Sequence, residues 1–168
     1  AYIAIKSGLF DIVLAGGVEK MQDLTRDMRT YWLGSSGDVE WERLAGVTFA
    51  GVYAMMAIRH MKEYGTKKEQ MTMCAVKNHR NAAKNPKAQF QREITLEQAM
   101  NSPMVAYPFT VFDCCGTTDG ASAVILASGE IAKKYTDTPI WVTGSGGGSD
   151  YLALHDRESI TRIDAAIK

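Results

Sequence analysis

Residues 10–17 read FDIVLAGG, a short and mostly apolar run that ends at two glycines. A run of this length over Phe10–Ala15, bounded by turn residues, is typical of a strand buried on both faces of a parallel sheet. The preceding residues 1–8 have the pattern of a helix end, with Gly8 as a left-handed cap. Another strand of small apolar residues is predicted over Ala121–Ala127. Strands that alternate with helices indicate an α/β fold.

The middle of the chain has helical patterns with clear start and stop signals. Two segments have the capping-box spacing of Ser or Thr followed three residues later by Glu or Gln. The first predicted helix covers residues 47–64 and ends at Gly65. The second covers residues 67–85, opens at the capping box Thr66-Lys67-Lys68-Glu69 and ends before Pro86. A third, short helix opens at Thr95-Leu96-Glu97-Gln98 and ends near Asn101. These helices suggest a compact helical insertion between the strands.

Two stretches are less regular, and both termini fall within helical patterns. Residues 19–46 lose periodicity and contain Trp32 and Trp41, so we expect a long loop or lid, which is usually functional. The remaining predicted elements are a helix over residues 129–134, a linker over 135–139, a strand over 140–144 and a helix over 159–168. The helical patterns at the ends lead us to expect an internal piece of a longer chain.

Composition excludes several classes of protein. Lys plus Arg and Asp plus Glu both number 19, so the net charge is zero, which argues against a dedicated nucleic-acid binder. Apolar residues are 46% and charged residues 23%, the balance of a folded globule. No apolar run approaches the roughly 20 residues that span a bilayer, so no membrane protein is expected. Three cysteines, two of them adjacent, indicate reduced thiols and a cytoplasmic protein.

Residues 144–150 (GSGGGSD) follow a predicted strand and have two interpretations. Glycine-rich loops after strands can cradle phosphate with backbone N–H groups. The stretch lacks the GxGxxG spacing and the P-loop lysine, however, and no helix pattern opens directly after it. The alternative is a flexible exit from the strand.

The histidines and cysteines also have a catalytic and a structural interpretation. His60, His79 and His155 are too far apart for a local metal motif, and one of them acting as a base would need a substrate within hydrogen-bond reach. Cys114 or Cys115 could be a nucleophile if its pKa were lowered, but no basic residue is adjacent. The alternative is a pair of closely packed small residues near a pocket. The absence of any CxxC spacing argues against a metal site.

Five groups of segments resemble the thiolase family in order and spacing, and more narrowly its sterol-carrier-protein-X-type and archaeal acetyl-CoA acetyltransferase branch. They are IKSG with DIVLAGGVEKM (5–8, 11–21), YGTKKEQ with AVKNH (64–70, 75–79), NPKAQF with EIT (85–90, 93–95), NSPMVA (101–106) and DGASAV (119–124). Each segment is weak evidence alone, whereas the ordered series covers nearly the whole chain.

The resemblance implies part of the five-layered αβαβα thiolase fold with a helical loop domain inserted. Residues 1–21 and 104–135 would belong to the N-terminal half, 22–103 to the covering loop domain, and 136–168 to the start of the C-terminal half. The family's nucleophilic Cys would lie upstream of Ala1, and its catalytic His and second acid/base group downstream of Lys168. No catalytic residue is therefore expected in this chain, which alone should be inactive.

The resemblance also implies which residues contact the substrate. The segment that folds over the thioester corresponds to Thr48, Phe49, Ala50 and Gly51, with Val47 before them. Cys115 and Gly116 correspond to a position near the pantetheine arm of CoA, where many relatives have a small hydroxyl residue. Candidates for a basic patch that meets the CoA phosphates, with a solvated helix face as the alternative, are Lys67, Lys68, Lys77, Arg80 and Lys84.

In the family, a Cys thiolate takes an acyl group from one CoA thioester, and Claisen condensation or its reverse follows. CoA is then substrate and product, and neither a further cofactor nor a metal is implied. The implied partners are acyl-CoA substrates, a homodimer or tetramer, and a small zinc-ribbon/OB-fold subunit. The alternatives are a non-catalytic scaffold or partner-binding subunit of an acyltransferase complex, and a relative of HMG-CoA synthase or ketoacyl synthase.

Overall fold

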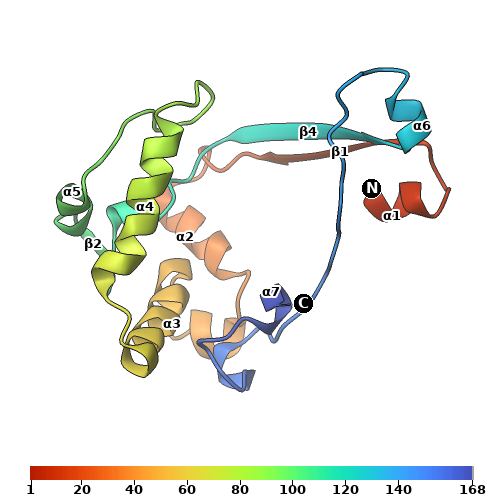
Figure 1. Cartoon of the computed structure of the whole chain (residues 1–168). Coiled ribbons are helices and arrows are strands. Elements are labelled where there is room, and N and C mark those ends of the chain that lie inside the picture. The colour runs from red at the N-terminus through yellow and green to blue at the C-terminus, as the bar shows by residue number, and fades with distance from the viewer. Residues whose placement is uncertain (168) are drawn as a thin grey trace. The chain divides into compact units, whose positions relative to one another are not determined.

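The computed structural model describes residues 1–167, which fall into two compact units (Figure 1). Unit 1 consists of residues 1–24 and 117–148, and unit 2 consists of residues 25–116 and 149–167. Helices and strands are both present, as the predicted α/β class requires. The predicted division at residues 22–103, 104–135 and 136–168 stays a prediction, because it refers to the halves of a larger fold.

Unit 1 is built on a two-stranded antiparallel sheet. Its elements are α1 (Tyr2–Lys6), β1 (Ile12–Glu19), β4 (Gly120–Ala127) and α6 (Gly129–Ala132). The ladder runs from the pair Ile12 and Ala127 to the pair Glu19 and Gly120. Gly8 has φ +73°, so the predicted left-handed residue after the first helix is confirmed.

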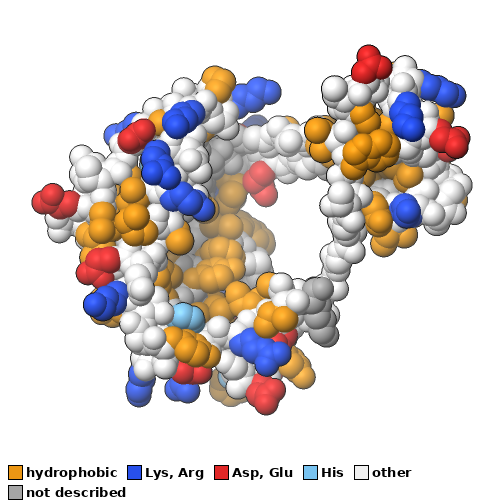
Figure 2. Space-filling model, viewed as in Figure 1, with side chains coloured by type: hydrophobic (Ala, Val, Ile, Leu, Met, Phe, Trp, Pro, Cys, Tyr) orange, Lys and Arg blue, Asp and Glu red, His pale blue; other side chains and the backbone are white. Residues whose placement is uncertain are grey.

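The prediction for the first strand is wrong in direction, length and burial. β1 pairs antiparallel with β4, extends to Glu19, and leaves apolar side chains in solvent, with Leu14 69% and Ile125 73% exposed. The physical reason is that the sheet is covered incompletely. Helix α1 contacts both strands, but no residue in the described part of unit 1 is buried. Figure 2 shows hydrophobic side chains on the surface of the molecule.

The strand predicted over residues 140–144 is also wrong, since this segment is irregular and Ile140 is 96% exposed. A strand requires a ladder partner for its backbone groups, and none of the described residues supplies one here. The predicted helix at residues 129–134 exists as the shorter α6.

Unit 2 is mostly helical. Its elements are α2 (Arg26–Gly34), the π-helix η1 (Val39–Arg43), α3 (Phe49–Tyr64), α4 (Lys68–Ala82), α5 (Leu96–Met100), β2 (Met104–Ala106), β3 (Phe109–Thr110), the 3₁₀ helices η2 (Val111–Asp113) and η3 (Leu154–Asp156), and α7 (Asp164–Ile167). Strands β2 and β3 form an antiparallel hairpin. Small side chains let the helices approach closely, and the buried apolar residues are Ala54, Ala57, Ile94, Ala99 and Ala153.

The predicted helices of unit 2 are confirmed with shifted ends. Gly65 ends α3 with φ +70°, and Thr95 caps α5 by a reciprocal pair of bonds with Gln98 of 3.0 and 3.1 Å. Helix α4 begins one residue later than predicted, because the backbone N–H of Lys67 donates to Gln70 Oε1 at 2.7 Å. It ends at Ala82 rather than near residue 85.

Two other expectations need correction. The loop predicted over residues 19–46 contains the end of β1 and the helices α2 and η1. The missed signals are short polar caps, since Thr25 caps α2 and Asp38 accepts the backbone N–H of Trp41 at 2.7 Å. The helix predicted from residue 159 is limited to α7, and Lys168 lies outside the described residues.

Among residues 1–167, no helix is long and apolar enough to cross a membrane.

Candidate functional site

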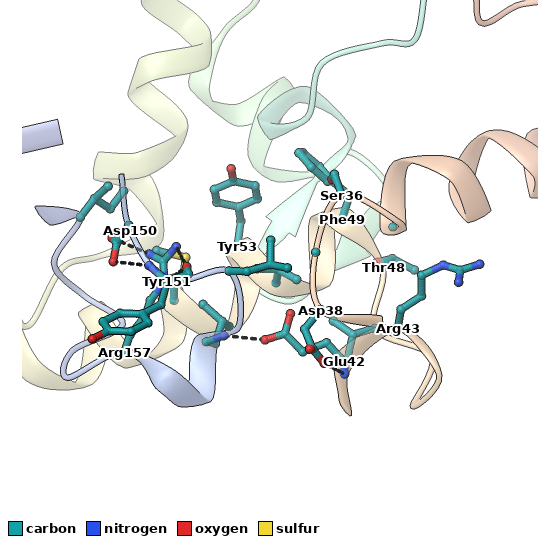
Figure 3. A pocket seen from close by; sticks show the side chains of 18 residues that line it. Ser36, Asp38, Glu42, Arg43, Thr48, Phe49, Tyr53, Asp150, Tyr151 and Arg157 are labelled. Atoms are coloured by element: carbon teal, nitrogen blue, oxygen red, sulfur yellow. Dashed lines mark hydrogen bonds and ion pairs between the residues drawn. The ribbon is translucent and has the colours of Figure 1, made fainter. Parts of the chain in front are cut away.

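A cavity of about 380 Å³ lies within unit 2 (Figure 3). Its walls come from the start of α3, from the segment 34–43 that contains η1, and from the segment 150–163. The apolar part of the lining comprises Val47, Phe49, Val52, Tyr53, Met56, Leu152, Leu154 and Ile163, and the charged part comprises Asp38, Glu42, Arg43, Asp150 and Arg157. Residues more than a hundred positions apart therefore share one concave and largely apolar site, the usual character of a small-molecule pocket.

The first turn of α3 forms one wall of the cavity. Thr48 is the N-cap, and its hydroxyl accepts the backbone N–H of Gly51 at 3.1 Å. This cap fixes the direction in which the helix begins and so places Phe49 at the cavity. The ring of Phe49 lies edge-on to that of Tyr53, with 5.4 Å between centroids. The two rings give this wall an aromatic surface.

The second wall is the π-helix η1, which is held at both ends. The Asp38 carboxylate caps its first turn, as described above. At the other end the guanidinium of Arg43 lies 3.5 Å from the centroid of the Tyr31 ring, and its Nε donates to the Tyr31 carbonyl at 3.2 Å. Figure 3 shows the Arg43 side chain directed away from Tyr53 and Arg157. Its positive charge is therefore used against α2 rather than inside the cavity.

The third wall, residues 150–157, is a loop closed on itself by Arg157. The Arg157 guanidinium pairs with the Asp150 carboxylate at 3.3 Å and donates to the Tyr151 carbonyl at 2.9 Å. The Glu42 carboxylate accepts the backbone N–H of Leu154 at 2.6 Å, which joins this loop to η1. The guanidinium groups of Arg43 and Arg157, both of which belong to the described lining, therefore already bind other groups of the protein. The site suits an uncharged or weakly polar group better than a phosphate.

The structure places the predicted site residues in two different parts of unit 2. Thr48 and Phe49 line the cavity, whereas Ala50 and Gly51 belong to the same helical turn without lining it. Cys115 and Gly116 also stay outside the described lining, and a Cβ added to Gly116 would meet the Phe90 ring at 3.6 Å. Their predicted contacts with the thioester and the pantetheine arm stay predictions.

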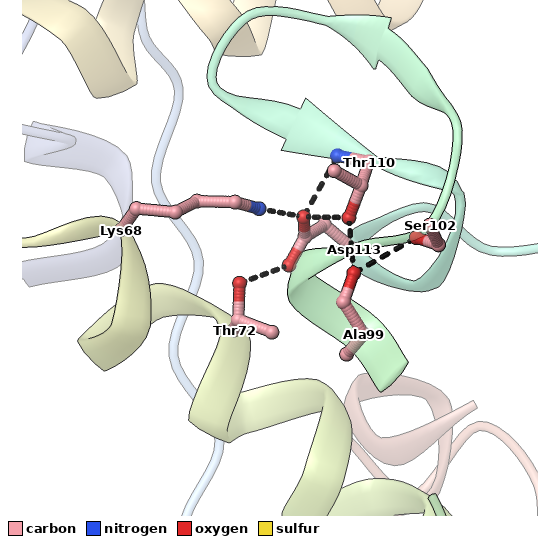
Figure 4. A network of polar contacts seen from close by, with 6 residues as sticks. All are labelled: Lys68, Thr72, Ala99, Ser102, Thr110 and Asp113. Atoms are coloured by element: carbon pink, nitrogen blue, oxygen red, sulfur yellow. Dashed lines mark hydrogen bonds and ion pairs between the residues drawn. The ribbon is translucent and has the colours of Figure 1, made fainter. Parts of the chain in front are cut away.

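A buried polar network that the sequence did not reveal centres on Asp113 (Figure 4). Its carboxylate is only 5% exposed and forms an ion pair with Lys68. It also accepts the Thr72 hydroxyl at 2.9 Å and, at 2.8 Å each, the backbone N–H and the hydroxyl of Thr110. Burial raises the pKa of Asp113, but the hydrogen bonds from Lys68, Thr110 and Thr72 outweigh this, so its pKa lies below the ordinary value.

The network affects two of the sequence hypotheses. Lys68 was a candidate for the basic patch, but its charge is committed to Asp113. The next residue, Cys114, is half-buried, and burial, together with the Asp113 charge, raises the pKa of its thiol. A raised pKa disfavours the thiolate that a nucleophile needs, which supports the interpretation of Cys114 as a packed residue.

The histidines contribute no base to the cavity. His60 Nδ1 lies 2.9 Å from the Thr66 hydroxyl, and His79 Nδ1 lies 3.1 Å from the Arg92 carbonyl. His155 is exposed beside Asp156. The glycine-rich residues 144–150 are irregular. No group of His, Cys, Asp or Glu that could hold a metal ion is found within residues 1–167.

Comparison with known proteins gives a consistent result. Residues 1–107 match the family model described as "Thiolase, N-terminal domain". The chain is 52% identical over 165 residues to an acetyl-CoA acetyltransferase of Methanothermobacter thermautotrophicus, covering 98% of this chain and 43% of that protein. It is 46% identical over 168 residues to an acetyl-CoA acetyltransferase of Methanocaldococcus jannaschii, covering 99% of this chain and 42% of that protein.

A solved structure has a similar fold. The chain resembles the "Ltp2-ChsH2(DUF35) aldolase" with a TM-score of 0.81 and 32% identity, over 97% of this chain and 43% of that one. The chain spans less than half the length of the curated relatives named above.

Proposed function

Because the chain belongs to the thiolase family, we propose that its protein is an acyltransferase that acts on CoA thioesters, either an acetyl-CoA C-acetyltransferase or a β-ketoacyl-CoA thiolase. The observation that carries the proposal is the 52% identity to an acetyl-CoA acetyltransferase across 98% of this chain. In the proposed reaction a Cys thiolate attacks the thioester carbonyl of an acyl-CoA, and CoA leaves as its thiol. An acid/base group delivers the proton to the departing CoA, and a base removes an α-proton from a second CoA thioester. The resulting carbanion then attacks the acyl-Cys and releases the thiolate. Thiolysis is the reverse.

The cavity in unit 2 is the proposed site of the acyl group. Its apolar walls at Phe49, Tyr53 and Leu154 suit a hydrocarbon chain, and the engaged state of Arg43 and Arg157 fits a neutral ligand. We propose that Thr48 and Phe49 cover the thioester, and that Cys115 and Gly116 contact the pantetheine arm.

The nucleophile and the acid/base groups are proposed to come from parts of the protein outside this chain, in keeping with its share of the relatives' length. Cys114 has a raised pKa, and Cys74 and Cys115 are free thiols away from the described cavity lining. None of them is proposed as the acyl carrier.

The test uses the full-length product of the gene. We expect cleavage of acetoacetyl-CoA by CoA, and an acyl-enzyme on a cysteine outside residues 1–168 when the protein is incubated with acyl-CoA and analysed by peptide mass spectrometry. The isolated 168-residue chain, as the control, should show neither. Absence of turnover with every acyl-chain length, together with absence of an acyl-enzyme, would contradict the proposal.

A second candidate function is that of a thiolase-like subunit that works with a partner subunit, as a scaffold or in carbon–carbon cleavage. The observation that favours it is the likeness to the structure named as an Ltp2-ChsH2(DUF35) aldolase. A small zinc-ribbon/OB-fold protein that co-purifies from the native host and is needed for turnover would support this candidate. Full thiolysis by the purified protein alone would exclude it.

We further propose a homodimer or tetramer in the cytoplasm that needs no cofactor besides its CoA substrates. The exposed apolar side chains of β1 and β4 support association or further covering layers, and the free thiols fit a reducing compartment. Kinship with HMG-CoA synthase or ketoacyl synthase stays a weaker alternative, which condensation assays with the corresponding thioesters would test.

A further inference from the structure

We propose that Glu42 is a positioning residue that fixes the loop 150–157 against η1 and thereby sets which acyl groups the cavity accepts. This inference rests on the proposed function, because it assigns a specificity role within the same site. It concerns the contact between two walls of the cavity rather than the thioester chemistry.

The contact itself is short and partly buried. Glu42 is 9% exposed, although carboxylates are rarely buried without a partner. Its Oε1 accepts the backbone N–H of Leu154 at 2.6 Å, and 112 positions separate the two residues. Figure 3 shows the bond as a dashed line between the Glu42 side chain and the backbone of the opposite wall. A charged acceptor makes such a bond stronger than a neutral pair would.

Glu42 is itself held in place, so it can act as an anchor. Its backbone N–H donates to Asp38 Oδ1 at 3.3 Å, within the capped first turn of η1. The next residue, Arg43, is fixed against Tyr31 by the stacking and the hydrogen bond described above. The carboxylate therefore projects from a short helix that is tied down on both sides.

The ion pair within the loop 150–157 does not attach this loop to η1. The bonds of Arg157 go to Asp150 and Tyr151, so they shape the loop without joining it to the other wall. Leu154 lines the cavity and opens η3, directly after the buried Ala153. The rings of Trp41 and His155 also meet edge-on between these two walls, with 6.5 Å between centroids, but Glu42 makes the hydrogen bond to Leu154 itself. We infer that this bond holds Leu154 at its distance from the aromatic wall at Phe49, and that this distance limits the size of the acyl group.

The proposed role requires that the side chain at position 42 accept a hydrogen bond from the Leu154 N–H. It does not require that this side chain be negatively charged. Glu42→Gln keeps an acceptor of the same reach, while Glu42→Met keeps the length and removes the acceptor. Glu40→Met is the matched control, because Glu40 lies on the same π-helix with an exposed side chain.

The experiment compares the full-length wild type with these three variants by two measurements. The first is hydrogen exchange at the Leu154 amide, where Glu42→Met should raise the rate by about tenfold or more. The second is the profile of kcat/KM across acetyl-, butyryl-, hexanoyl- and octanoyl-CoA. In Glu42→Met the ratio between the preferred and the next-longer acyl group should shrink by about fivefold, through KM rather than kcat. Glu40→Met should keep both properties within about twofold. Glu42→Gln should keep the acyl-chain profile within about twofold, and it should raise the exchange rate less than Glu42→Met does, because a neutral acceptor makes a weaker bond.

The outcomes separate this inference from the proposed function. Activity with an unchanged chain-length profile in Glu42→Met overturns the inference alone, as does a Glu42→Gln variant that behaves like Glu42→Met. Inactivity of the wild type toward every acyl-CoA overturns the proposed function and the specificity role together. If Glu42→Met does not fold, the wild type and Glu42→Gln provide the test. A wild-type Leu154 amide that exchanges like an unprotected amide overturns the inference. Strong protection of that amide, together with an unchanged acyl-chain profile in Glu42→Gln, supports it.

Discussion

The two units of this chain are held together in different ways. Every buried residue of the described chain lies in unit 2, from Glu42 to Ala153, and none lies in unit 1. Unit 1 relies on the backbone ladder between β1 and β4. Unit 2 adds a core of small apolar side chains and the closed polar network around Asp113.

This difference shows where precise geometry can be maintained. A two-stranded ribbon with exposed apolar faces is at best marginally stable in water. Side chains on such a ribbon cannot be held to a fraction of an ångström without further covering layers. The packed helices of unit 2 can hold a cavity wall in place, and the candidate site lies there.

The largest effect is expected from Asp113→Ala in unit 2. It removes the acceptor for Lys68, Thr72 and Thr110 and leaves their donors partly or fully buried without a partner. Breaking a pair of this kind should cost about 3 kcal/mol of the free energy of unfolding. Urea unfolding of the full-length protein, with hydrogen exchange along α4, measures this cost.

The matched change in unit 1 is Asp119→Ala. Asp119 is exposed and accepts the backbone N–H groups of Met21 and Gln22 at 2.8 and 2.9 Å. Because water can replace these bonds, we expect a loss of about 1 kcal/mol or less. Equal losses at Asp113 and Asp119 would contradict the described difference between the units.

The same network makes unit 2 sensitive to acid. Since the pKa of Asp113 in the folded protein lies below its ordinary value of 3.8, the carboxylate stabilises the fold at higher pH. This contribution is lost as the pH falls through the lowered pKa, because the folded state must then take up a proton at a cost. Urea midpoints measured between about pH 6 and about pH 2 should fall less steeply in Asp113→Asn than in the wild type. Parallel curves would contradict the assignment to Asp113.

Local signals explain what the sequence could predict. The helix ends at Gly65 and Thr95 were found because a left-handed glycine and a capping box are encoded within a few residues. The pairing of β1 depends on a partner a hundred residues away, so a short apolar run could not reveal that it is antiparallel and exposed. The strand predicted at residues 140–144 failed for the same reason.

The candidate site was predictable to a similar extent. The resemblance to thiolases predicted substrate contacts for six residues. Thr48 and Phe49 line the cavity, whereas Ala50, Gly51, Cys115 and Gly116 do not, and the contacts themselves stay predictions. Glu42 and Asp113 were missed, because their partners lie 112 and 45 positions away at Leu154 and Lys68. The residues next to a carboxylate in the sequence do not indicate whether folding will bury it.

A packing prediction compares two alanines. Ala99 in α5 is 0% exposed, so Ala99→Val should force its neighbours apart and cost about 1–3 kcal/mol. Ala121 in β4 is exposed, and Ala121→Val should change stability by no more than about 0.5 kcal/mol, because valine favours strands. Thermal unfolding of both variants measures the contrast. A tolerated valine at position 99 would show that the core around α5 is loosely packed.

A smaller effect than those of Asp113→Ala and Ala99→Val is expected from two glycines that have the same conformation in different units. Gly8 and Gly65 have φ angles of +73° and +70°, and a Cβ at either position would meet no other atom within 4 Å. Alanine at either position should therefore cost about 1 kcal/mol through backbone strain alone. In Gly65→Ala the cost should lower the midpoint of global unfolding, because α3 belongs to the packed unit. In Gly8→Ala it should appear only as faster hydrogen exchange in α1, since a five-residue helix outside a packed core opens by itself. An equal fall in the global midpoint for both variants would show that unit 1 unfolds together with unit 2, despite its lack of buried side chains.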